Sequence, residues 1–439
     1  MYKRENQIMR WMLVALLTFS FGLAHAGPEI QHWQTSNGAR VYYVPAPELP
    51  MVDIRIIFDG AGARDKIPGV ALMTNGLLEE GAGDMDADKI ADAFAAVGAQ
   101  FGASSHRDMS VVSLRSLTDT KLLNKAVDTM TQVISQPSFP EASLERERKR
   151  LLIALQGKKQ SPGAIAKEAF FNALYGDHPY ANEATGTEDS VKQIQREDLI
   201  KHHQRYYVGR NAIIAIVGAV DKKLAGALAE AILGPLPAGE PAKPIPEVNA
   251  LTKANLVKKE FPSSQTHLLV GQPAVKRGDE DYFALYLGNH ILGGSGLVSR
   301  LSGEIREKRG LSYSTYSFFS PMRQLGPFRL GLQTKNDQAE EALKILQQTL
   351  VEFMQDGPSA EELEAAKKNI TGGFALNLDS NGKIIENIAM IGFYQLPLDY
   401  LDTYTDKIDA VTIDQIKAAF KRHVQPDKMV TVMVGGDAE

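Results

Sequence analysis

Residues 111–155, VVSLRSLTDTKLLNKAVDTMTQVISQPSFPEASLERERKRLLIAL, decide the fold because their pattern returns at residues 328–373, FRLGLQTKNDQAEEALKILQQTLVEFMQDGPSAEELEAAKKNITGG. Each segment opens with alternating apolar residues, which predicts a half-buried strand, and continues into an amphipathic helix. A proline-containing break then precedes a second helix, which opens with SLER in the first segment and with ELEA in the second. The order strand, helix, break, helix therefore occurs twice.

Other stretches match between the two halves in the same order. NGLLEEG from Asn75 matches NHILGGS from Asn289, and GAQFGASS from Gly98 matches GLSYSTYS from Gly310. The spacing between matched residues drifts only slightly along the chain, as an old internal duplication with small insertions would produce. The sequence therefore predicts two homologous domains.

A proline-rich stretch, PLPAGEPAKPIPEV, divides the two halves and is typical of a semi-rigid extended linker. We place a signal segment at 1–26, the first domain at 27–236, the linker at 237–249 and the second domain at 250–439. Strand patterns such as GARVYYV and MVDIRIIF follow each other like antiparallel neighbours, without strict βαβ alternation. The predicted fold class is α+β, with a mostly antiparallel sheet covered by helices in each domain.

The N-terminal segment 1–26 has the three regions of a secretory signal peptide. MYKRENQIMR supplies a basic start, WMLVALLTFSFGL is apolar, and Ala24-His25-Ala26 offers a small-x-small cleavage site. The apolar run is too short to cross a bilayer core of about 30 Å as a straight helix. An uncleaved, tilted anchor is the alternative. We expect an exported, periplasmic protein that begins near Gly27, with no stable membrane insertion after cleavage.

The composition excludes several kinds of site and partner. The chain of 439 residues has no cysteine, which excludes disulfides, zinc–thiolate sites, iron–sulfur clusters and thiol nucleophiles. The formal net charge is -5 and no long basic tract occurs, so nucleic acid is not an expected partner.

None of the nine histidines occurs in H-x-x-H, H-x-x-x-H or H-E-x-x-H, spacings that bring two ligands together on one helix face. His202 and His203 are adjacent in the sequence, so a helix would point their side chains about 100° apart. The surrounding IKHHQRYY predicts a surface helix with solvated histidines. We therefore predict that this chain binds no metal.

Four stretches resemble parts of a known family. They are GARDKIPGVALMTNGLLEEGAG (62–83), FPEASLERERKRLLIAL (139–155), the segment 175–221, and REKRGLSYSTYSFF (306–319). In this order they resemble the pitrilysin/insulinase family of zinc peptidases, which includes the mitochondrial processing peptidase and the cytochrome bc1 core proteins. The resemblance covers nearly the whole chain after the leader and implies the family's fold.

The resemblance also implies where the family's zinc site would lie. The inverted motif H-x-x-E-H places two histidine ligands and a general base on one helix, and a later helix supplies a glutamate ligand. The corresponding positions here are Leu72, Asn75, Gly76 and Ala154, although Glu147 keeps the first glutamate of the later helix. Leucine, glycine and alanine have no donor atom for zinc, and asparagine cannot take a proton from water. We expect a packed, metal-free helix in place of the site.

The second half keeps a pair of residues with catalytic potential. Arg306 and Tyr313 in IREKRGLSY resemble the family's Arg/Tyr pair, which faces the zinc and holds the substrate carbonyl. A guanidinium and a phenol are both hydrogen-bond donors, so together they can stabilise a developing oxyanion. Spacing alone would fit an ordinary helix charge and a strand aromatic; the resemblance favours the substrate-binding role.

In this chain the first half lacks the zinc-site residues and the second half keeps the Arg/Tyr pair. Such a combination is typical of one subunit of a two-protein enzyme. The resemblance implies a non-catalytic subunit that supplies Arg306 and Tyr313 in trans to an H-x-x-E-H zinc peptidase subunit, within a heterodimer. This chain would bind no cofactor itself, the zinc would lie in the partner, and activity would require the complex. The alternative is a catalytically silent scaffold or peptide-binding module of the same fold.

The expected substrate is an unfolded peptide. Residues Gly98, Ala99, Gln100, Phe101 and Gly102 resemble the family's strand that pairs with an extended peptide. Main-chain pairing at a sheet edge favours extended chains over folded proteins. Small residues in such a strand leave room for a second chain to approach.

Overall fold

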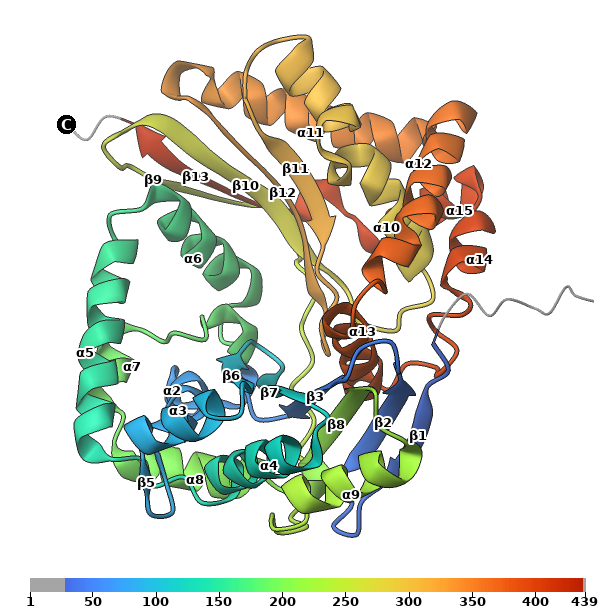
Figure 1. Cartoon of the computed structure of the whole chain (residues 1–439). Coiled ribbons are helices and arrows are strands. Elements are labelled where there is room, and N and C mark those ends of the chain that lie inside the picture. The colour runs from blue at the N-terminus through green and yellow to red at the C-terminus, as the bar shows by residue number, and fades with distance from the viewer. Residues whose placement is uncertain (1–27, 437–439) are drawn as a thin grey trace, which may run out of the picture.

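The computed structural model describes residues 28–436 and shows two sheets with helices around them (Figure 1). The predicted signal peptide at 1–26 lies outside the described residues. Among residues 28–436, none of the helices combines the length and hydropathy needed to cross a membrane. Helices and mostly antiparallel strands mix in both halves, which confirms the predicted α+β class.

The first sheet has six strands in the order β1-β2-β8-β3-β7-β6. Its β2–β8 pair is parallel and its other neighbouring pairs are antiparallel. The fully buried sequence AIIAIVG explains why β8 is central, because a strand covered on both faces needs a continuous apolar run. The strands are β1 (Gln31–Gln34), β2 (Arg40–Pro45), β3 (Met51–Phe58), β6 (Gln100–Ser105), β7 (Ser110–Leu117) and β8 (Ala212–Gly218).

The second sheet has five strands in the order β11-β12-β10-β13-β9, and its single parallel pair is β13–β9. Read from β9, this order is that of β2, β8, β3, β7 and β6 in the first sheet, with the parallel pair in the same place. Such shared topology is what the internal repeat predicts. The strands are β9 (Asn255–Lys259), β10 (Ser263–Val275), β11 (Thr315–Phe319), β12 (Gly326–Lys335) and β13 (Val430–Gly436), beside a small ribbon of β4 (Gly81–Ala82) and β5 (Met85–Asp86).

The helix–break–helix pattern of the repeat appears as α4 (Thr120–Ser135) with α5 (Glu141–Lys158), and as α11 (Ala339–Asp356) with α12 (Ala360–Gly373). Side-chain caps fix two of these starts. The Asp119 carboxylate accepts the first free N–H groups of α4, and Ser359 forms a capping box with Glu362 at α12.

The remaining helices follow the chain from the zinc-motif region onward. They are α2 (Val70–Gly76), α3 (Ala87–Ala95), α6 (Pro162–Tyr175), α7 (Glu188–Gln193), α8 (Arg196–Tyr206), α9 (Lys222–Leu233), α10 (Tyr282–Asn289), α13 (Asn381–Tyr394), α14 (Tyr404–Asp409) and α15 (Ile413–His423). One face of each sheet packs on helices of its own half. Ile54 and Ile56 of β3 belong to the first core, and Leu268 and Val270 of β10 belong to the second.

The two halves exchange a helix. Helix α6 of the first half packs against β10 and β13 of the second sheet, where Phe170, Leu269 and Val432 belong to one buried cluster. Helix α13 of the second half packs against β8 and β3 of the first sheet (Figure 1), and Ile388 and Ile213 belong to the same buried cluster. Each sheet is thereby sandwiched between its own helices and one helix from the other half.

A buried carboxylate also joins the halves. Asp108, which is 3% exposed, lies in the β6–β7 turn and accepts hydrogen bonds from the hydroxyls of Tyr180 (2.6 Å) and Tyr394 (3.1 Å). It also accepts the backbone N–H of Arg323, at 2.8 Å, from the second half. Because the Tyr394 hydroxyl and the Arg323 N–H lose their partner if the halves separate, this contact opposes opening.

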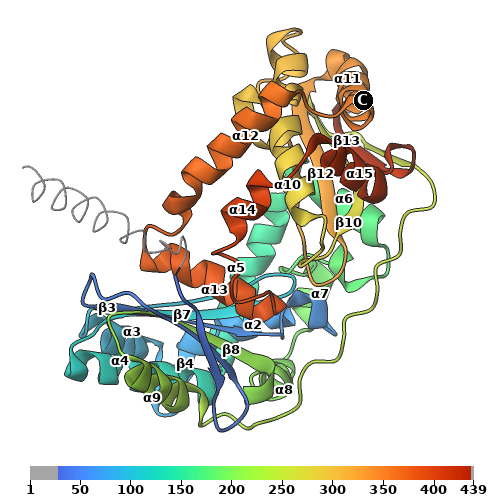
Figure 2. The same ribbon diagram turned by 90° about the vertical axis from the view of Figure 1, so that its right-hand side faces the viewer.

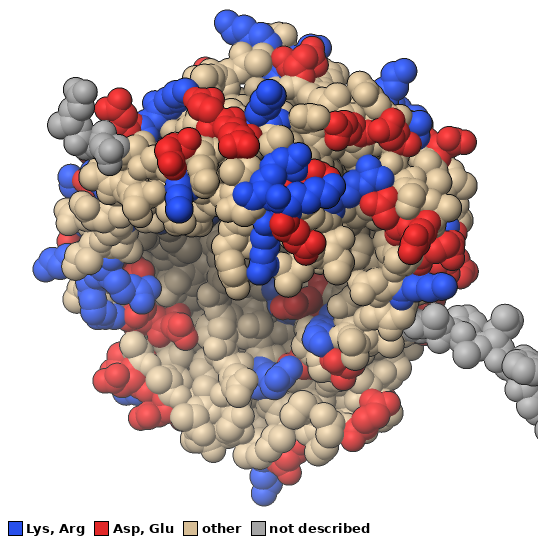
Figure 3. Space-filling model, turned by 90° about the horizontal axis from the view of Figure 1, so that it is seen from above, with Lys and Arg blue, Asp and Glu red and all other residues tan. Residues whose placement is uncertain are grey.

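The predicted linker 237–249 forms neither helix nor strand and extends along one side of the molecule (Figure 2). It is held by backbone bonds from Gly209 to Pro237 (2.9 Å) and from Arg210 to Ala238 (2.9 Å). The domain bounds at 27–236 and 250–439 stay predictions. Seen from above, Lys and Arg side chains are interspersed with Asp and Glu side chains on the surface (Figure 3).

Candidate functional site

The four positions that correspond to the family's zinc site lie on α2 and α5. Leu72 is half-buried and packs against the first core, whereas Asn75 is 1% exposed. Gly76 is exposed, and a Cβ atom added there would meet no heavy atom within 4 Å. Ala154 is exposed on α5. The expectation of a packed site is therefore wrong at Gly76 and Ala154, where small side chains leave open surface, and right at Leu72 and Asn75.

Asn75 has a structural role that uses its whole amide. Its Nδ2 donates to the carbonyl oxygens of Ser104 (2.6 Å) and Val111 (3.0 Å), which lie on β6 and β7. Its Oδ1 accepts the hydroxyl of buried Tyr207 at 2.8 Å. Asn75 therefore ties α2 to the edge of the first sheet and to the residue that follows α8.

The second half contains the same bond at the matching position. Asn289 ends α10, and its Nδ2 donates to the carbonyl oxygen of Ser317 on β11 at 3.0 Å. The Ser317 hydroxyl in turn donates to Asn289 Oδ1 at 2.7 Å. Helix α2 therefore resembles α10 of the second half, because an asparagine near the end of each helix bonds to the neighbouring strand.

These residues do not fit a zinc ion. Leu72, Gly76 and Ala154 have no donor atom, and both polar atoms of Asn75 are already bonded. Glu147 is bound by Arg150 at 2.7 Å. The family's metal-activated water therefore has no place in this half of the chain.

The prediction of solvated histidines on α8 is wrong. His202 and His203 are both buried, and their Nε2 atoms bond to the carbonyl oxygens of Gly60 (2.7 Å) and Ile134 (2.8 Å). Burial lowers the pKa of His202 to about 4. The sequence pattern around them is polar because neighbouring helix positions face solvent, while these two rings fix α8 to the segment after β3 and to α4.

We expect His202 to make the fold acid-sensitive. Its pKa in the folded state lies below the unfolded value of about 6.5, so the unfolded state binds more protons at this site. The contribution of His202 to stability therefore falls by about 2 kcal/mol from pH 7 to pH 5. In His202→Gln the amide can still donate to Gly60. The free energy of unfolding at pH 5, taken relative to that at pH 7, should therefore be about 2 kcal/mol higher in the variant than in the wild type, as measured by urea unfolding at both pH values.

Asp65 changes the stability with pH in the direction opposite to His202. Its contribution is the same in the wild type and in His202→Gln, so it cancels when the two proteins are compared. Burial raises its pKa to about 7, although its carboxylate accepts the N–H groups of Gly69 (2.9 Å) and Ala71 (2.9 Å) at the start of α2. Its contribution to stability therefore falls as pH rises from about 4 to about 7, equally in both proteins. An unchanged pH dependence in His202→Gln would contradict the assignment of the acid sensitivity to His202.

One group of three potential metal ligands exists among residues 28–436, namely Asp279, Asp281 and His423. Both oxygens of Asp281 are bound by Arg422, at 2.6 and 2.8 Å, and one of them also by His423 at 3.0 Å. The cluster is therefore already a charge-paired network, and Arg422 repels a cation that would enter it.

The structure brings Arg306 and Tyr313 together. Arg306 lies in a π-helical turn, η7 (Ser302–Glu307), and its guanidinium carbon is 4.5 Å from the centre of the Tyr313 ring. Tyr313 is 84% exposed. π-Helical turns are frequent at functional sites. The pair therefore presents two hydrogen-bond donors at one point of the surface.

The neighbouring cations differ from Arg306. Lys308 and Arg309 both bind the Glu304 carboxylate, at 2.5 and 2.7 Å. Within the part of the chain that the structure describes, Arg306 forms no ion pair with a carboxylate. Its guanidinium N–H groups are thus available to an acceptor from outside the chain.

The predicted peptide-binding residues Gly98 to Gly102 lie at one edge of the first sheet. Gly98 adopts a positive φ of 64° in the turn after α3, and Gln100, Phe101 and Gly102 begin β6. Strand β6 pairs with β7 on one side and is the last strand of its sheet. Its other edge offers main-chain groups for a further strand.

Sequence reasoning missed a second group on the facing half. Arg329 of β12 lies over the Phe318 ring of β11 at 4.4 Å, and Tyr316 covers Gly331. Arg329 pairs with Gly271 in the sheet, and Gly271 faces Phe170 of α6. The stack therefore lies on the face of the second sheet that α6 partly covers. The sequence feature that could have predicted this stack is the alternation of aromatic residues after Tyr313, at Tyr316 and Phe318.

Two family models match the chain in sequence. The model described as "Insulinase (Peptidase family M16)" matches residues 57–188, and the model described as "Peptidase M16 inactive domain" matches residues 193–370. Among solved structures, a peptidase M16 inactive domain from Pseudomonas fluorescens has 40% sequence identity and a TM-score of 0.90. The similarity covers 93% of this chain and 98% of that chain.

Two bacterial sequences are similar over most of their length. The protein named "Uncharacterized zinc protease YmxG" from Bacillus subtilis is 25% identical, over 88% of this chain and 94% of that protein. The protein named "Non-peptidase homolog YmxG" from Helicobacter pylori is 25% identical, over 97% of this chain and 98% of that protein. With the shared two-domain architecture and the 40% identity to the Pseudomonas fluorescens structure, these matches show that the chain belongs to peptidase family M16, the insulinase family.

Proposed function

We propose that this protein is the non-catalytic subunit of an exported heterodimeric zinc endopeptidase. The observation that carries the proposal is the contrast between the two halves: Asn75 is committed to a structural network, while Arg306 and Tyr313 lie together with their donors available. The names "inactive domain" and "non-peptidase homolog" among the relatives support a chain without its own hydrolytic site.

In this proposal Arg306 and Tyr313 enter the active site of an H-x-x-E-H partner. The partner's zinc supplies the hydrolytic chemistry. Arg306 donates guanidinium N–H groups and Tyr313 donates its hydroxyl proton to the carbonyl oxygen of the bound peptide, whose negative charge grows as the tetrahedral intermediate forms. The Arg306–Tyr313 stacking, at 4.5 Å, holds the guanidinium in place before the peptide arrives.

The substrate in this proposal is an extended peptide that pairs with the free edge of β6. The Arg329–Phe318 stack on the second half supplies a cation and aromatic surface for side chains of that peptide. Main-chain pairing tolerates many sequences, so the preference would be for unfolded chains rather than for one motif.

Gly102→Val is expected to weaken peptide binding with little loss of stability. A Cβ atom at Gly102 would have one close neighbour, the Ser113 hydroxyl at 3.2 Å, so the strand can accept the change. The bulk at the sheet edge should remove about one peptide hydrogen bond and raise KM for an extended peptide about tenfold. Asn255→Val, on the edge strand β9 of the other sheet, is the matched control. An unchanged KM in Gly102→Val would exclude β6 as the peptide site.

The proposal is tested by cleavage of quenched peptides by the mature chain, alone and mixed with an H-x-x-E-H family member from the same cell. We expect no cleavage by the chain alone and zinc-dependent cleavage by the mixture. Cleavage by the chain alone would overturn the reading of α2 as metal-free.

The second candidate is a peptide-binding scaffold. The fully bonded Asn75 network favours it, because such a helix is stable without any partner. Peptide binding by the isolated chain, with no cleavage when the H-x-x-E-H protein is added, would support this function instead.

A further inference from the structure

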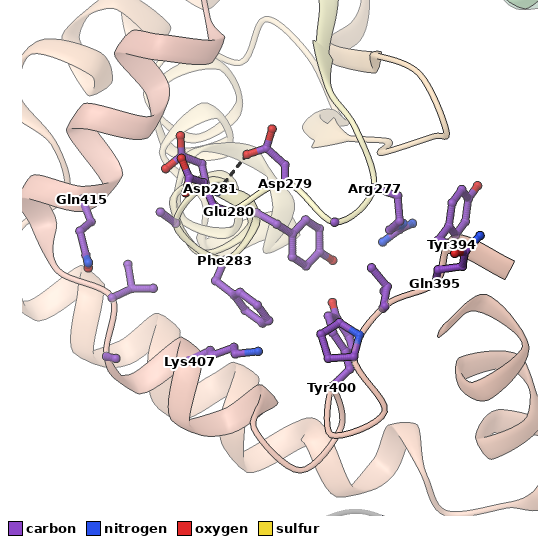
Figure 4. A pocket seen from close by; sticks show the side chains of 17 residues that line it. Arg277, Asp279, Glu280, Asp281, Phe283, Tyr394, Gln395, Tyr400, Lys407 and Gln415 are labelled. Carbon is purple, nitrogen blue, oxygen red and sulfur yellow. Dashed lines mark hydrogen bonds between the residues drawn. The ribbon is translucent and has the colours of Figure 1, made fainter. Parts of the chain in front are cut away.

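A pocket of about 650 Å³ lies in the second half, between the N-terminal end of α10, the C-terminal end of α13 and the segment that contains α14 (Figure 4). It is separate from the Arg306–Tyr313 pair. Arg277 lies two residues beyond Val275, the last residue of β10, whereas Thr315, two residues after Tyr313, lies level with Leu268 near the middle of that strand. The volume is within the range of small-molecule sites.

Aromatic rings form much of the pocket wall. Tyr282 and Phe283 of α10 meet Tyr400, with 5.9 Å between the ring centres of Phe283 and Tyr400, and Tyr394 closes the side near α13. Tyr400 is 8% exposed, so its ring is held by packing. Such a wall suits a flat or apolar group.

Two cations lie among these rings. Arg277 stands beside Tyr394 on one side of the pocket, and Lys407 stands beside Phe283 on the other (Figure 4). The Arg277 guanidinium carbon is 5.7 Å from the Tyr282 ring centre and 5.5 Å from that of Tyr394. Its Nε is buried and has no hydrogen-bond partner among residues 28–436, and neither cation has a carboxylate partner there.

The acidic groups of the pocket are arranged differently. Asp281 is already bound by Arg422 and His423, while Asp279 and Glu280 remain at the rim beside α10. These carboxylates leave the two cations unpaired, yet they repel a ligand with several negative charges. The pocket therefore favours a single carboxylate.

We infer that this pocket binds the carboxylate of an aromatic or large apolar amino-acid residue, such as the C-terminal residue of a short peptide. The fork of Arg277 receives the carboxylate and the rings of Tyr282, Phe283 and Tyr400 receive the side chain. Arginine suits this task because its planar donors match a carboxylate in a bidentate way.

The test is calorimetric titration of the isolated mature chain with N-acetyl-phenylalanine and with its amide. The acid should bind with a Kd of about 1 mM or tighter, given typical binding energies per ligand atom. The amide should bind about tenfold more weakly, because it lacks the charge-assisted pair. Because no partner subunit is present, failure here leaves the proposed peptidase role unaffected.

Variants separate the site from nonspecific binding. Arg277→Gln should weaken binding of the acid about tenfold, whereas Lys276→Gln, the same charge change one residue earlier and outside the pocket lining, should not. Ala410→Leu fills part of the pocket without changing charge and should also weaken binding, which keeps the test valid if Arg277→Gln unfolds. Equal binding of acid and amide, or wild-type affinity in both variants, would overturn the inference.

A last arm identifies the source of the carboxylate. Ala-Ala-Phe that binds at least as tightly as N-acetyl-phenylalanine, with loss on amidation, supports a peptide C-terminus as the ligand. If N-acetyl-phenylalanine binds and the tripeptide does not, the pocket is still a carboxylate site. The ligand is then a free aromatic acid, and the assignment to a peptide C-terminus is overturned.

Discussion

Arg306→Ala is expected to lower kcat of the assembled peptidase by about 10²–10³-fold, the usual loss when one oxyanion donor is removed. The guanidinium lies over the Tyr313 ring and has no carboxylate partner among the described residues, so its removal leaves no unpaired acid behind. Its loss should therefore act on the reaction more than on the fold. KM should change less than kcat, because the developing oxyanion exists only in the transition state.

The controls separate chemistry from assembly. Arg309→Ala removes the same charge three residues further on, from a side chain that already binds Glu304, and should leave kcat near the wild-type value. Tyr313→Phe keeps the ring beneath Arg306 but removes the second donor, and should lower kcat while the complex still forms on size-exclusion chromatography. Wild-type turnover in Arg306→Ala would exclude the role of Arg306 in the partner's active site and would favour the peptide-binding scaffold instead.

The sequence predicted the repeated pattern because periodicity reports which face of a segment is buried. The strand before α4 and the strand before α11 became β7 and β12, at equivalent places in the two sheets. Periodicity does not report which partner covers that face. The apolar faces of α6 and α13 are as compatible with their own sheet as with the other one, so the helix exchange could not be predicted.

In the candidate site too, some features follow from residue type alone and others depend on tertiary partners. The absence of donor atoms at Leu72, Gly76 and Ala154 is a property of residue type and could be read directly. The burial of His202 and His203 could not, because their partners are backbone carbonyls of Gly60 and Ile134, which carry no residue-specific signal. The Arg329–Phe318 stack likewise depends on the strand register, which sets Phe318 of β11 opposite Arg329 of β12.

Asn75→Leu is expected to lower the free energy of unfolding by about 3 kcal/mol. The substitution leaves the buried Tyr207 hydroxyl without its acceptor and removes the donor from the carbonyls of Ser104 and Val111. Each buried polar group that loses its partner costs about 1–3 kcal/mol. Urea denaturation followed by circular dichroism gives the value.

A double-mutant cycle decides whether the network or the lost volume is responsible. Tyr207→Phe removes the hydroxyl that Asn75 accepts, so Asn75→Leu should cost about 1 kcal/mol less in that background than in the wild type. Asn289→Leu is the matched change in the second half and should also destabilise, because Ser317 loses its acceptor there. Strict additivity of Asn75→Leu and Tyr207→Phe would contradict the network.

The cycle also bears on why the metal site is absent from this chain. A glutamate at position 75, as the family motif requires, would aim a carboxylate at the Ser104 and Val111 carbonyl oxygens, acceptor against acceptor. Asn75→Glu should therefore destabilise the fold more than Asn75→Leu, since it adds a buried charge to the lost bonds. If so, histidines at 72 and 76 and a glutamate at 154 would not suffice to rebuild a peptidase. If Asn75→Glu is instead no more destabilising than Asn75→Leu, α2 can accommodate the base and the asparagine is not what keeps the chain inactive.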